Sequence, residues 1–236
     1  MSDPTGCGCD DCCQESLPVL LEGGDERTGE LRELAFGLLL RDRTPVPPSA
    51  LAALIGTDEA SVRAVLDGLA REGRIDRDNS GRVMGSAGLT LGEGPHGLEI
   101  DGHAFRTWCA FDALGIPAAL AVEARIETGC GVCGRPIGVE FRAGRPIGEA
   151  EAILWLSAGG ADMRADFCTP TVLLCSDEHA QVWAERQAGH GRALTLAEAT
   201  EEGARNWRST AAAAVRVLET DRDKPAPPGQ GPPPFG

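Results

Sequence analysis

The apolar pattern of this 236-residue chain changes near Leu89, and the change limits the folds open to it. Before Leu89, apolar residues recur every three or four positions, as on one face of a helix. After Leu89, short apolar runs broken by Gly and Pro alternate with longer helical patterns. The sequence therefore predicts an α+β fold, in which an N-terminal helical module packs on a mixed α/β domain with short strands.

The N-terminal module is predicted to be a winged helix-turn-helix. Helical spacing predicts one helix from about Glu30 to Leu40 and a short helix over Ala50–Ile55, which Ser49 would cap. Another helix is expected to end near Glu72, before a β-hairpin over Arg74–Met84. Helices joined by a turn and followed by a hairpin are typical of that motif.

The charge of this module argues against DNA binding. Residues 45–84 hold five arginines and six acidic residues, and the whole chain has a net charge of −14. Phosphate contacts and base reading both depend on clustered Lys and Arg. We therefore expect a packing and covering module with no DNA partner.

The rest of the chain is predicted to alternate strands and helices. Strands are expected at Leu98–Ile100, Ala121–Glu127, Gly138–Phe141, Glu151–Leu156 and Thr171–Cys175. Helices are expected at His103–Leu114, Asp177–Gln187 and, with breaks, Leu196–Val217. The predicted divisions are a disordered Cys-rich tail (1–24), the winged-helix-like domain (25–86), the main domain (87–218) and a disordered Pro-rich tail (219–236).

Cysteine usage is the most informative part of the composition. The chain has no apolar run of the roughly 18 residues that a membrane helix needs, and its start lacks the pattern of a signal peptide. We therefore expect a soluble cytoplasmic protein with no membrane partner. In that reducing compartment, nine cysteines are more often metal ligands or nucleophiles than disulfides.

One thiol and one carboxyl group are predicted to be neighbours. Cys109 and Asp112 are three positions apart in the expected helix His103–Leu114, with Phe105 one turn earlier. A carboxylate beside a thiol can accept the thiol proton and deliver it elsewhere. Taken alone, the helix favours a plainer interpretation: Cys109 is a small buried hydrophobe, Asp112 a solvated residue and Trp108 a core residue.

The segment Gly102–Pro117, GHAFRTWCAFDALGIP, resembles the signature helix of the organomercurial (alkylmercury) lyases. That family places a catalytic cysteine and aspartate in a Trp-Cys-Ala-x-Asp run. Gly88–Leu91, Cys130 and Asp166–Cys168 also fall where the family has like residues, and the similarity extends over about residues 30–210. Members of that family have the winged-helix module but do not bind DNA with it.

The resemblance implies an alkylmercury lyase, with residues 87–218 as its catalytic domain. By position, Cys109 and Cys168 are similar to the two catalytic cysteines, Asp112 to the proton-handling carboxylate and Cys130 to a structural cysteine. The implied reaction is protonolysis of a carbon–mercury bond, leaving Hg(II) on Cys109, Cys168 and Asp112. Mercury is then substrate and product rather than cofactor. Low-molecular-weight thiols would release it, and a mercuric reductase is the expected downstream partner.

The segment after Cys168 departs from the family. The family often continues with a second Cys or an Asn and then an aromatic His-Phe-Phe stretch, where this chain has Thr169–Leu174. The departure concerns the shape of the substrate pocket rather than the chemistry.

The cysteines outside the catalytic set leave two questions open. Cys130 and Cys133 resemble one knuckle of a zinc ribbon, but no second C-x-x-C follows. The four histidines (His96, His103, His179 and His190) show no ligand spacing, so the ligand count argues against zinc. Cys175, like Cys133, lies outside the resemblance. The tail thiols form either a mercury relay or a dispensable tail: Cys7, Cys9, Cys12 and Cys13.

Two other functions compete with the lyase. The first is a non-catalytic thiol metal-binding or metal-responsive regulatory protein, built on the winged helix and the cysteines. Such a protein needs only thiolates and a basic recognition helix, whereas a carboxyl group close to Cys109 is what a lyase requires. The second is a lyase-like protein turned to another organometal or thiol chemistry.

Overall fold

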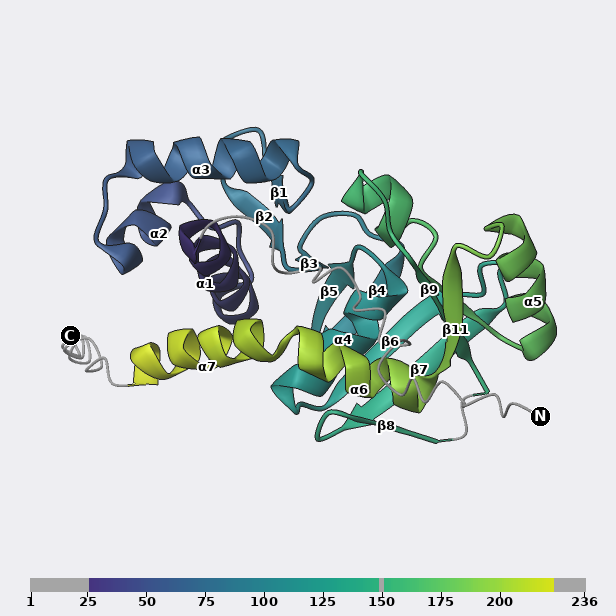
Figure 1. Cartoon of the computed structure of the whole chain (residues 1–236). Helices are drawn as coiled ribbons and strands as arrows, with labels where there is room; N and C mark the ends of the chain where they lie inside the picture. Colours follow the sequence, from purple (N-terminus) through teal and green to yellow (C-terminus); the bar gives the residue numbers. More distant parts are fainter. Residues whose placement is uncertain (1–25, 149–150, 223–236) are drawn as a thin grey trace, which may run out of the picture.

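The computed structural model describes residues 26–148 and 151–222, which form a mixed α and β fold (Figure 1). The first half contains α1 (Glu26–Asp42), α2 (Pro48–Ile55), α3 (Glu59–Arg71), β1 (Ile75–Arg77), β2 (Val83–Ser86), β3 (Leu89–Thr90), β4 (His96–Ile100), β5 (His103–Thr107) and α4 (Ala110–Leu120). The second half contains β6 (Ala124–Gly129), β7 (Pro136–Arg142), β8 (Arg145–Ile147), β9 (Ile153–Ser157), the π-helical turn η1 (Met163–Cys168), β10 (Val172–Leu174), α5 (Asp177–Arg186), β11 (Gly191–Thr195), α6 (Leu196–Asn206) and α7 (Arg208–Arg222).

Two antiparallel sheets organise the described residues. The larger has eight strands in the order β1-β2-β3-β5-β4-β6-β7-β8, and the smaller has the order β10-β9-β11. The hairpin β1–β2 thus continues directly into the main sheet. Helix α4 packs against α6, and α7 runs alongside α1 (Figure 1). The C-terminal helix therefore joins the first helix to the rest of the fold.

The helices and hairpin of the N-terminal segment lie where the sequence predicted them. Asp58 caps α3 by accepting the backbone N–H of Ser61. The predicted cap Ser49 is wrong: α2 starts at Pro48, preceded by Pro47, and Ser49 lies inside it. Proline suits the first turn of a helix because its missing N–H has no partner there anyway. The winged helix-turn-helix interpretation and the boundary near residue 86 stay predictions.

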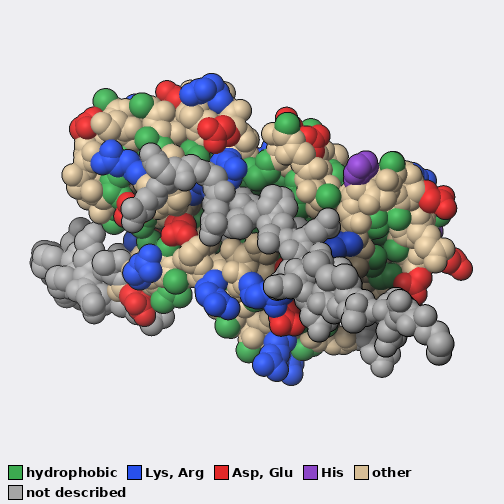
Figure 2. All heavy atoms as spheres, in the orientation of Figure 1, with side chains coloured by type: hydrophobic (Ala, Val, Ile, Leu, Met, Phe, Trp, Pro, Cys, Tyr) green, Lys and Arg blue, Asp and Glu red, His purple; other side chains and the backbone are tan. Residues whose placement is uncertain are grey.

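The arginines of this segment are paired with acidic neighbours. Arg63 pairs with Glu59, Arg77 with Asp67, and Arg82 with Asp78. On the face drawn in Figure 2, acidic and basic side chains are intermixed over α1, α2 and α3. The absence of a DNA partner remains an expectation.

The predicted helix His103–Leu114 is wrong in its first half. His103–Thr107 is strand β5, paired with β4 across the Asp101-Gly102 turn. Burial alternates along β5, with Phe105 and Thr107 inside, so the segment has the two-residue period of a strand. Helix α4 begins only after Cys109, and Phe105 does not precede Cys109 on a helix face.

The other predicted strands and helices of the main domain are present, with ends shifted by a few residues. None of the described helices is long and apolar enough to cross a membrane. The predicted Cys-rich tail, including Cys7, Cys9, Cys12 and Cys13, lies outside the described residues, and so does the Pro-rich tail from residue 223 on. The predicted start of the Pro-rich tail at residue 219 is wrong, because residues 219–222 are the end of helix α7.

Candidate active site

Two thiols and one carboxyl group meet inside the protein, as the resemblance implied. The Cys109 and Cys168 sulfurs and a carboxylate oxygen of Asp112 all lie within 4.8 Å of one another. Cys109 has no exposed surface, and the other two side chains are each 6% exposed. These groups can therefore act together on one atom that enters from outside.

The start of α4 positions the first two groups. The Cys109 sulfur accepts the backbone N–H of Asp112 at 3.4 Å, and Asp112 Oδ2 accepts the backbone N–H of Cys109 at 2.7 Å. This is a capping box, in which each side chain binds an N–H group that the helix leaves free. The predicted proximity of Cys109 and Asp112 thus arises from a helix cap rather than from one face of a helix.

Gly88 makes room for the Asp112 carboxylate. Its φ is +90°, and a β-carbon at this position would overlap the carboxylate. The Gly88 carbonyl accepts the backbone N–H of Trp108 at 3.0 Å, which holds the two segments together. A glycine is required here both for its backbone conformation and for the close approach.

Cys168 is the last residue of η1. Asp162 starts this turn by accepting the backbone N–H groups of Arg164 and Ala165. After the turn, Thr171 donates its backbone N–H to the Cys168 carbonyl and accepts the N–H of Ala110. This contact places the end of η1 against the start of α4, so the two thiols meet although 59 positions separate them.

Burial shapes the electrostatics of the three groups. It raises the pKa of Asp112 to about 6, although hydrogen bonds from Cys109 and the charge of Arg164 lower it in part. Burial and the neighbouring Cys168 and Asp112 groups raise the pKa of Cys109 well above that of a free thiol. Burial therefore favours a neutral Cys109 thiol beside an Asp112 carboxyl group whose pKa is raised to about 6.

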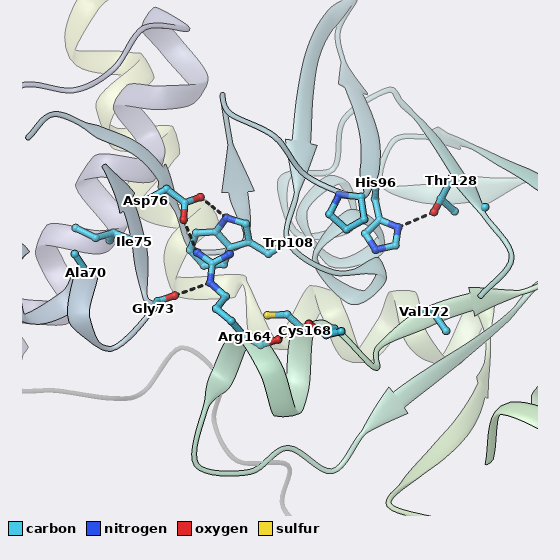
Figure 3. A pocket seen from close by; sticks show the side chains of 13 residues that line it. Ala70, Gly73, Ile75, Asp76, His96, Trp108, Thr128, Arg164, Cys168 and Val172 are labelled. Atoms are coloured by element: carbon cyan, nitrogen blue, oxygen red, sulfur yellow. Dashed lines mark hydrogen bonds and ion pairs between the residues drawn. The ribbon is translucent and has the colours of Figure 1, made fainter. Parts of the chain in front are cut away.

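A cavity of about 620 Å³ opens onto Cys168 (Figure 3). One wall comes from the N-terminal segment and includes Ile75 and Asp76. The facing wall includes His96 and Val172. Cys109 does not line this cavity, so a ligand that enters it meets the Cys168 sulfur first.

Trp108 and Arg164 form one side of the cavity. The Arg164 guanidinium stacks on the Trp108 ring at 3.3 Å and donates to Asp76 at 2.8 Å and to the Gly73 carbonyl at 2.7 Å. The Trp108 indole N–H donates to the other Asp76 oxygen at 2.7 Å (Figure 3). Trp108 is mostly buried, as predicted, and it also lines the cavity.

The segment Thr169–Leu174, which the resemblance leads us to expect to differ from the family, contributes to the cavity. Thr169 and Val172 both line it, whereas the buried Leu173 and Leu174 do not. This segment therefore forms part of the cavity wall next to Cys168.

A second group of potential metal ligands brings together Cys130, Cys133, Cys175 and His179. Burial raises the pKa of the Cys130 thiol, but backbone N–H groups of Cys133 and Val132 outweigh it, and the pKa falls to about 6. The expectation that no histidine has ligand spacing is wrong for His179, which follows Cys175 by four residues. The C-x₃-H spacing after the C-x₂-C pair is the signal that could have revealed this group.

No local pattern predicted the Arg164–Asp76 contact, because the two residues are 88 positions apart. Gly88 could have been recognised as a positioning residue, because a glycine just before a short strand often marks a close backbone approach.

The mixed α and β fold places two thiols and a carboxyl group beside a cavity, which defines a class of protein with a candidate site for a soft metal ion. A sequence profile of the alkylmercury lyase family, MerB, matches residues 89–208. An alkylmercury lyase from Pseudomonas putida is 33% identical over 163 residues, which cover 67% of this chain and 72% of that protein. One from Bacillus cereus is 28% identical over 186 residues, which cover 77% and 82%.

The fold agrees with these sequence matches. A crystal structure of the mercury-bound form of MerB2 superposes with a TM-score of 0.71 at 24% identity, covering 82% of this chain and 95% of that chain. The chain belongs to the alkylmercury lyase family and is an alkylmercury lyase enzyme.

Proposed function

We propose that the protein cleaves carbon–mercury bonds by protonolysis at Cys109, Asp112 and Cys168, releasing a hydrocarbon and retaining Hg(II). One observation carries this proposal: two thiols and a carboxyl group with a pKa near neutrality converge beside a cavity. Mercury is a soft cation, and thiolates are the ligands that such ions prefer. A protein that only bound mercury would need the thiolates but not the buried Asp112.

Cys168 captures the substrate first, because it lines the cavity and Cys109 does not. The Cys168 thiol exchanges with the small thiolate bound to the substrate, R–Hg–SR′: the Cys168 sulfur–mercury bond forms, the mercury–SR′ bond breaks, and the Cys168 proton leaves with R′SH. The apolar side chains of Ile75, Val172 and Trp108 line the space that would hold the organic group.

Cys109 then binds the same mercury. Its proton passes to the Asp112 carboxylate, because a thiol that coordinates a soft metal is deprotonated. The second sulfur raises the electron density on mercury and weakens the carbon–mercury bond.

The Asp112 carboxylic acid completes the reaction. It gives the proton to the leaving carbon, and the electron pair of the carbon–mercury bond becomes the new carbon–hydrogen bond. A pKa of about 6 suits a group that first accepts and then donates a proton near neutral pH. Hg(II) then has two sulfurs and an Asp112 oxygen as ligands.

Release of Hg(II) requires thiols from solution. The proposed cycle uses no other cofactor, since mercury is substrate and product. We propose that low-molecular-weight thiols remove the ion and that a mercuric reductase accepts it downstream.

The test is incubation with phenylmercury and excess thiol, followed by measurement of benzene. We expect Cys168→Ser to lose both capture and benzene release. Cys109→Ser should still capture phenylmercury, as shown by the mass of the adduct, but should release no benzene. Asp101→Asn, in the exposed β4–β5 turn, is the control and should behave as wild type. Benzene release by Cys168→Ser at the wild-type rate would disprove the proposed chemistry.

A further inference from the structure

The ligand atoms of Cys130, Cys133, Cys175 and His179 lie close enough together to hold one metal ion, and none of these residues belongs to the proposed active site. The Cys133 and Cys175 sulfurs are 3.8 Å apart. His179 Nδ1 lies 3.2 Å from the Cys175 sulfur and 3.5 Å from the Cys130 sulfur. All four ligand atoms lie within 4.8 Å of one another.

These separations match those around a zinc ion. With Zn–S bonds of about 2.3 Å and Zn–N bonds of about 2.0–2.1 Å, a tetrahedral site places two sulfurs about 3.8 Å apart. The same bond lengths place a sulfur and an imidazole nitrogen about 3.6 Å apart. The side chains therefore already surround a volume of the right size.

The turn between β6 and β7 is shaped as a metal-binding knuckle. Cys130 begins the turn, its carbonyl accepts the backbone N–H of Gly134 at 2.8 Å, and backbone N–H groups of Val132 and Cys133 point at its sulfur. Gly134 has a φ of +72°, which lets the chain turn back into β7. The turn thus presents two sulfurs on one side.

The other two ligands come from the start of α5. Ser176 caps this helix by accepting the backbone N–H of His179, which fixes His179 in the first turn. Cys175 lies just before the cap, so its sulfur and the His179 ring face the knuckle together. The four ligands therefore come from two rigid and well-separated segments of the chain.

We propose that Cys130, Cys133, Cys175 and His179 bind one structural Zn²⁺ ion. Three cysteines and one histidine form a closed zinc site that leaves no position for substrate. Three sulfurs this close would repel one another as thiolates, and a divalent cation among them removes that repulsion. Hard cations such as Ca²⁺ and Mg²⁺ prefer oxygen ligands, which this group lacks.

The zinc site would stabilise the wall of the substrate cavity. Cys130 directly follows Gly129, and the next residue, Gly131, donates its backbone N–H to Leu173 at 3.0 Å. Gly129 and Val172, the neighbour of Leu173, both line the cavity. A metal that links the knuckle to α5 thus fixes two segments that the substrate would contact.

The test measures zinc in protein produced with zinc and without mercury. We expect wild type to contain one Zn²⁺ per chain by elemental analysis and native mass spectrometry. Cys133→Ser and His179→Ala should lose it, whereas His179→Cys should keep it because four ligands remain. Cys109→Ser is the matched control: it removes one thiol from the active site and should keep the zinc.

Cobalt gives a second readout, which needs only wild type and His179→Cys. Co²⁺ bound to wild type should show the visible bands of tetrahedral cobalt and a sulfur-to-cobalt charge-transfer band. His179→Cys should strengthen the charge-transfer band. Removal of the metal by a chelator should lower Tm by roughly 10 °C, since a tightly bound ion stabilises only the folded state.

Three results would overturn the proposal. Wild type could contain no zinc and bind no tetrahedral cobalt. Its mass could instead be lower by two hydrogens, which indicates a Cys133–Cys175 disulfide. Zinc could be lost from Cys109→Ser and kept in Cys133→Ser, which would assign the metal to the active site.

Discussion

Cys109 and Asp112 cap one another: the thiol sulfur accepts the backbone N–H of Asp112, and the carboxylate accepts the backbone N–H of Cys109. The two hydrogen bonds fix both side chains at the start of α4 before any substrate arrives. One Asp112 oxygen is held by the backbone, and the carboxylate faces the two sulfurs. The acid that is proposed to protonate carbon is thus oriented by the same bonds that start the helix.

Asp112→Asn separates mercury binding from bond cleavage. The Asn oxygen can still accept the Cys109 backbone N–H, so the cap and both thiols should remain in place. The amide cannot take or give the proton, so benzene release from phenylmercury should fall by about 10²- to 10⁴-fold. Turnover is measured by benzene formation and binding by the mass of the mercury adduct. Turnover at the wild-type rate would rule out the proton-donor role.

Asp112→Asn should also raise the free energy of unfolding at neutral pH. Burial raises the pKa of Asp112 from 3.8 to about 6, so the folded state holds the carboxyl proton more tightly than the unfolded state does. Below pH 3.8 the carboxyl group is protonated in both states and does not lower the free energy of unfolding. Between pH 3.8 and about 6 the unfolded state ionises first, so the free energy of unfolding falls as the pH rises. The difference between the two pKa values corresponds to about 3 kcal/mol.

The measurement is urea unfolding of wild type and Asp112→Asn from pH 4 to pH 8. The gain in unfolding free energy of the variant should rise up to about pH 6 and stay constant above it. Asp101→Asn, whose side chain is exposed, should show no such trend. A gain that does not change with pH would contradict the raised pKa of Asp112.

Local signals in the sequence predicted much of the fold. Helix α3 ends at Arg71, close to the expected Glu72, and helix α5 starts at Asp177 as expected, directly after the cap Ser176. The predicted helix His103–Leu114 is wrong in its first half because buried Phe105 and Thr107 alternate with exposed Ala104 and Arg106. This two-residue period is too short to be distinguished from the first turn of a helix.

Long-range contacts in the site could not be predicted from local patterns. Cys168 meets Cys109 because the residues after η1 bind the start of α4, and only the family resemblance anticipated this contact. Cys175 and His179 have a ligand spacing in the sequence, but their approach to Cys130 and Cys133 depends on tertiary packing that no local pattern shows.

Gly88→Ala tests how closely the backbone must approach Asp112. An added β-carbon would overlap the carboxylate, so Asp112 must move away from the thiols. Benzene release should fall by at least tenfold, and Tm should decrease. Gly102→Ala is the matched control, because Gly102 also has a positive φ, +78°, but has no atom within 4 Å of the added carbon.

Gly102→Ala should lose only the stability expected from backbone strain, about 1 kcal/mol, and should keep the wild-type activity. Activity and Tm of both variants are compared under the same conditions. Equal losses of activity in the two variants would mean that strain, rather than contact with Asp112, explains the effect of Gly88→Ala.

Arg164 should act on both substrate capture and the proton-handling carboxyl group. It belongs to the turn that ends at Cys168, and it joins that turn to Asp76 and Trp108. Arg164→Lys keeps the charge but cannot stack on the ring and bind two acceptors at once. We therefore expect its KM for phenylmercury to rise several-fold, with a smaller change in kcat and an unchanged pH profile.

Arg164→Gln removes the charge as well. The positive charge of Arg164 lowers the pKa of Asp112, so its loss should raise that pKa further above 6. Because Asp112 must be ionised to accept the Cys109 proton, the rising limb of kcat/KM against pH should move to higher pH in Arg164→Gln but not in Arg164→Lys. Arg192→Gln, which removes a remote arginine paired with Glu202, is the control for net charge. An equal shift of the limb in Arg192→Gln would show that overall charge, rather than the position of Arg164, sets the proton affinity of Asp112.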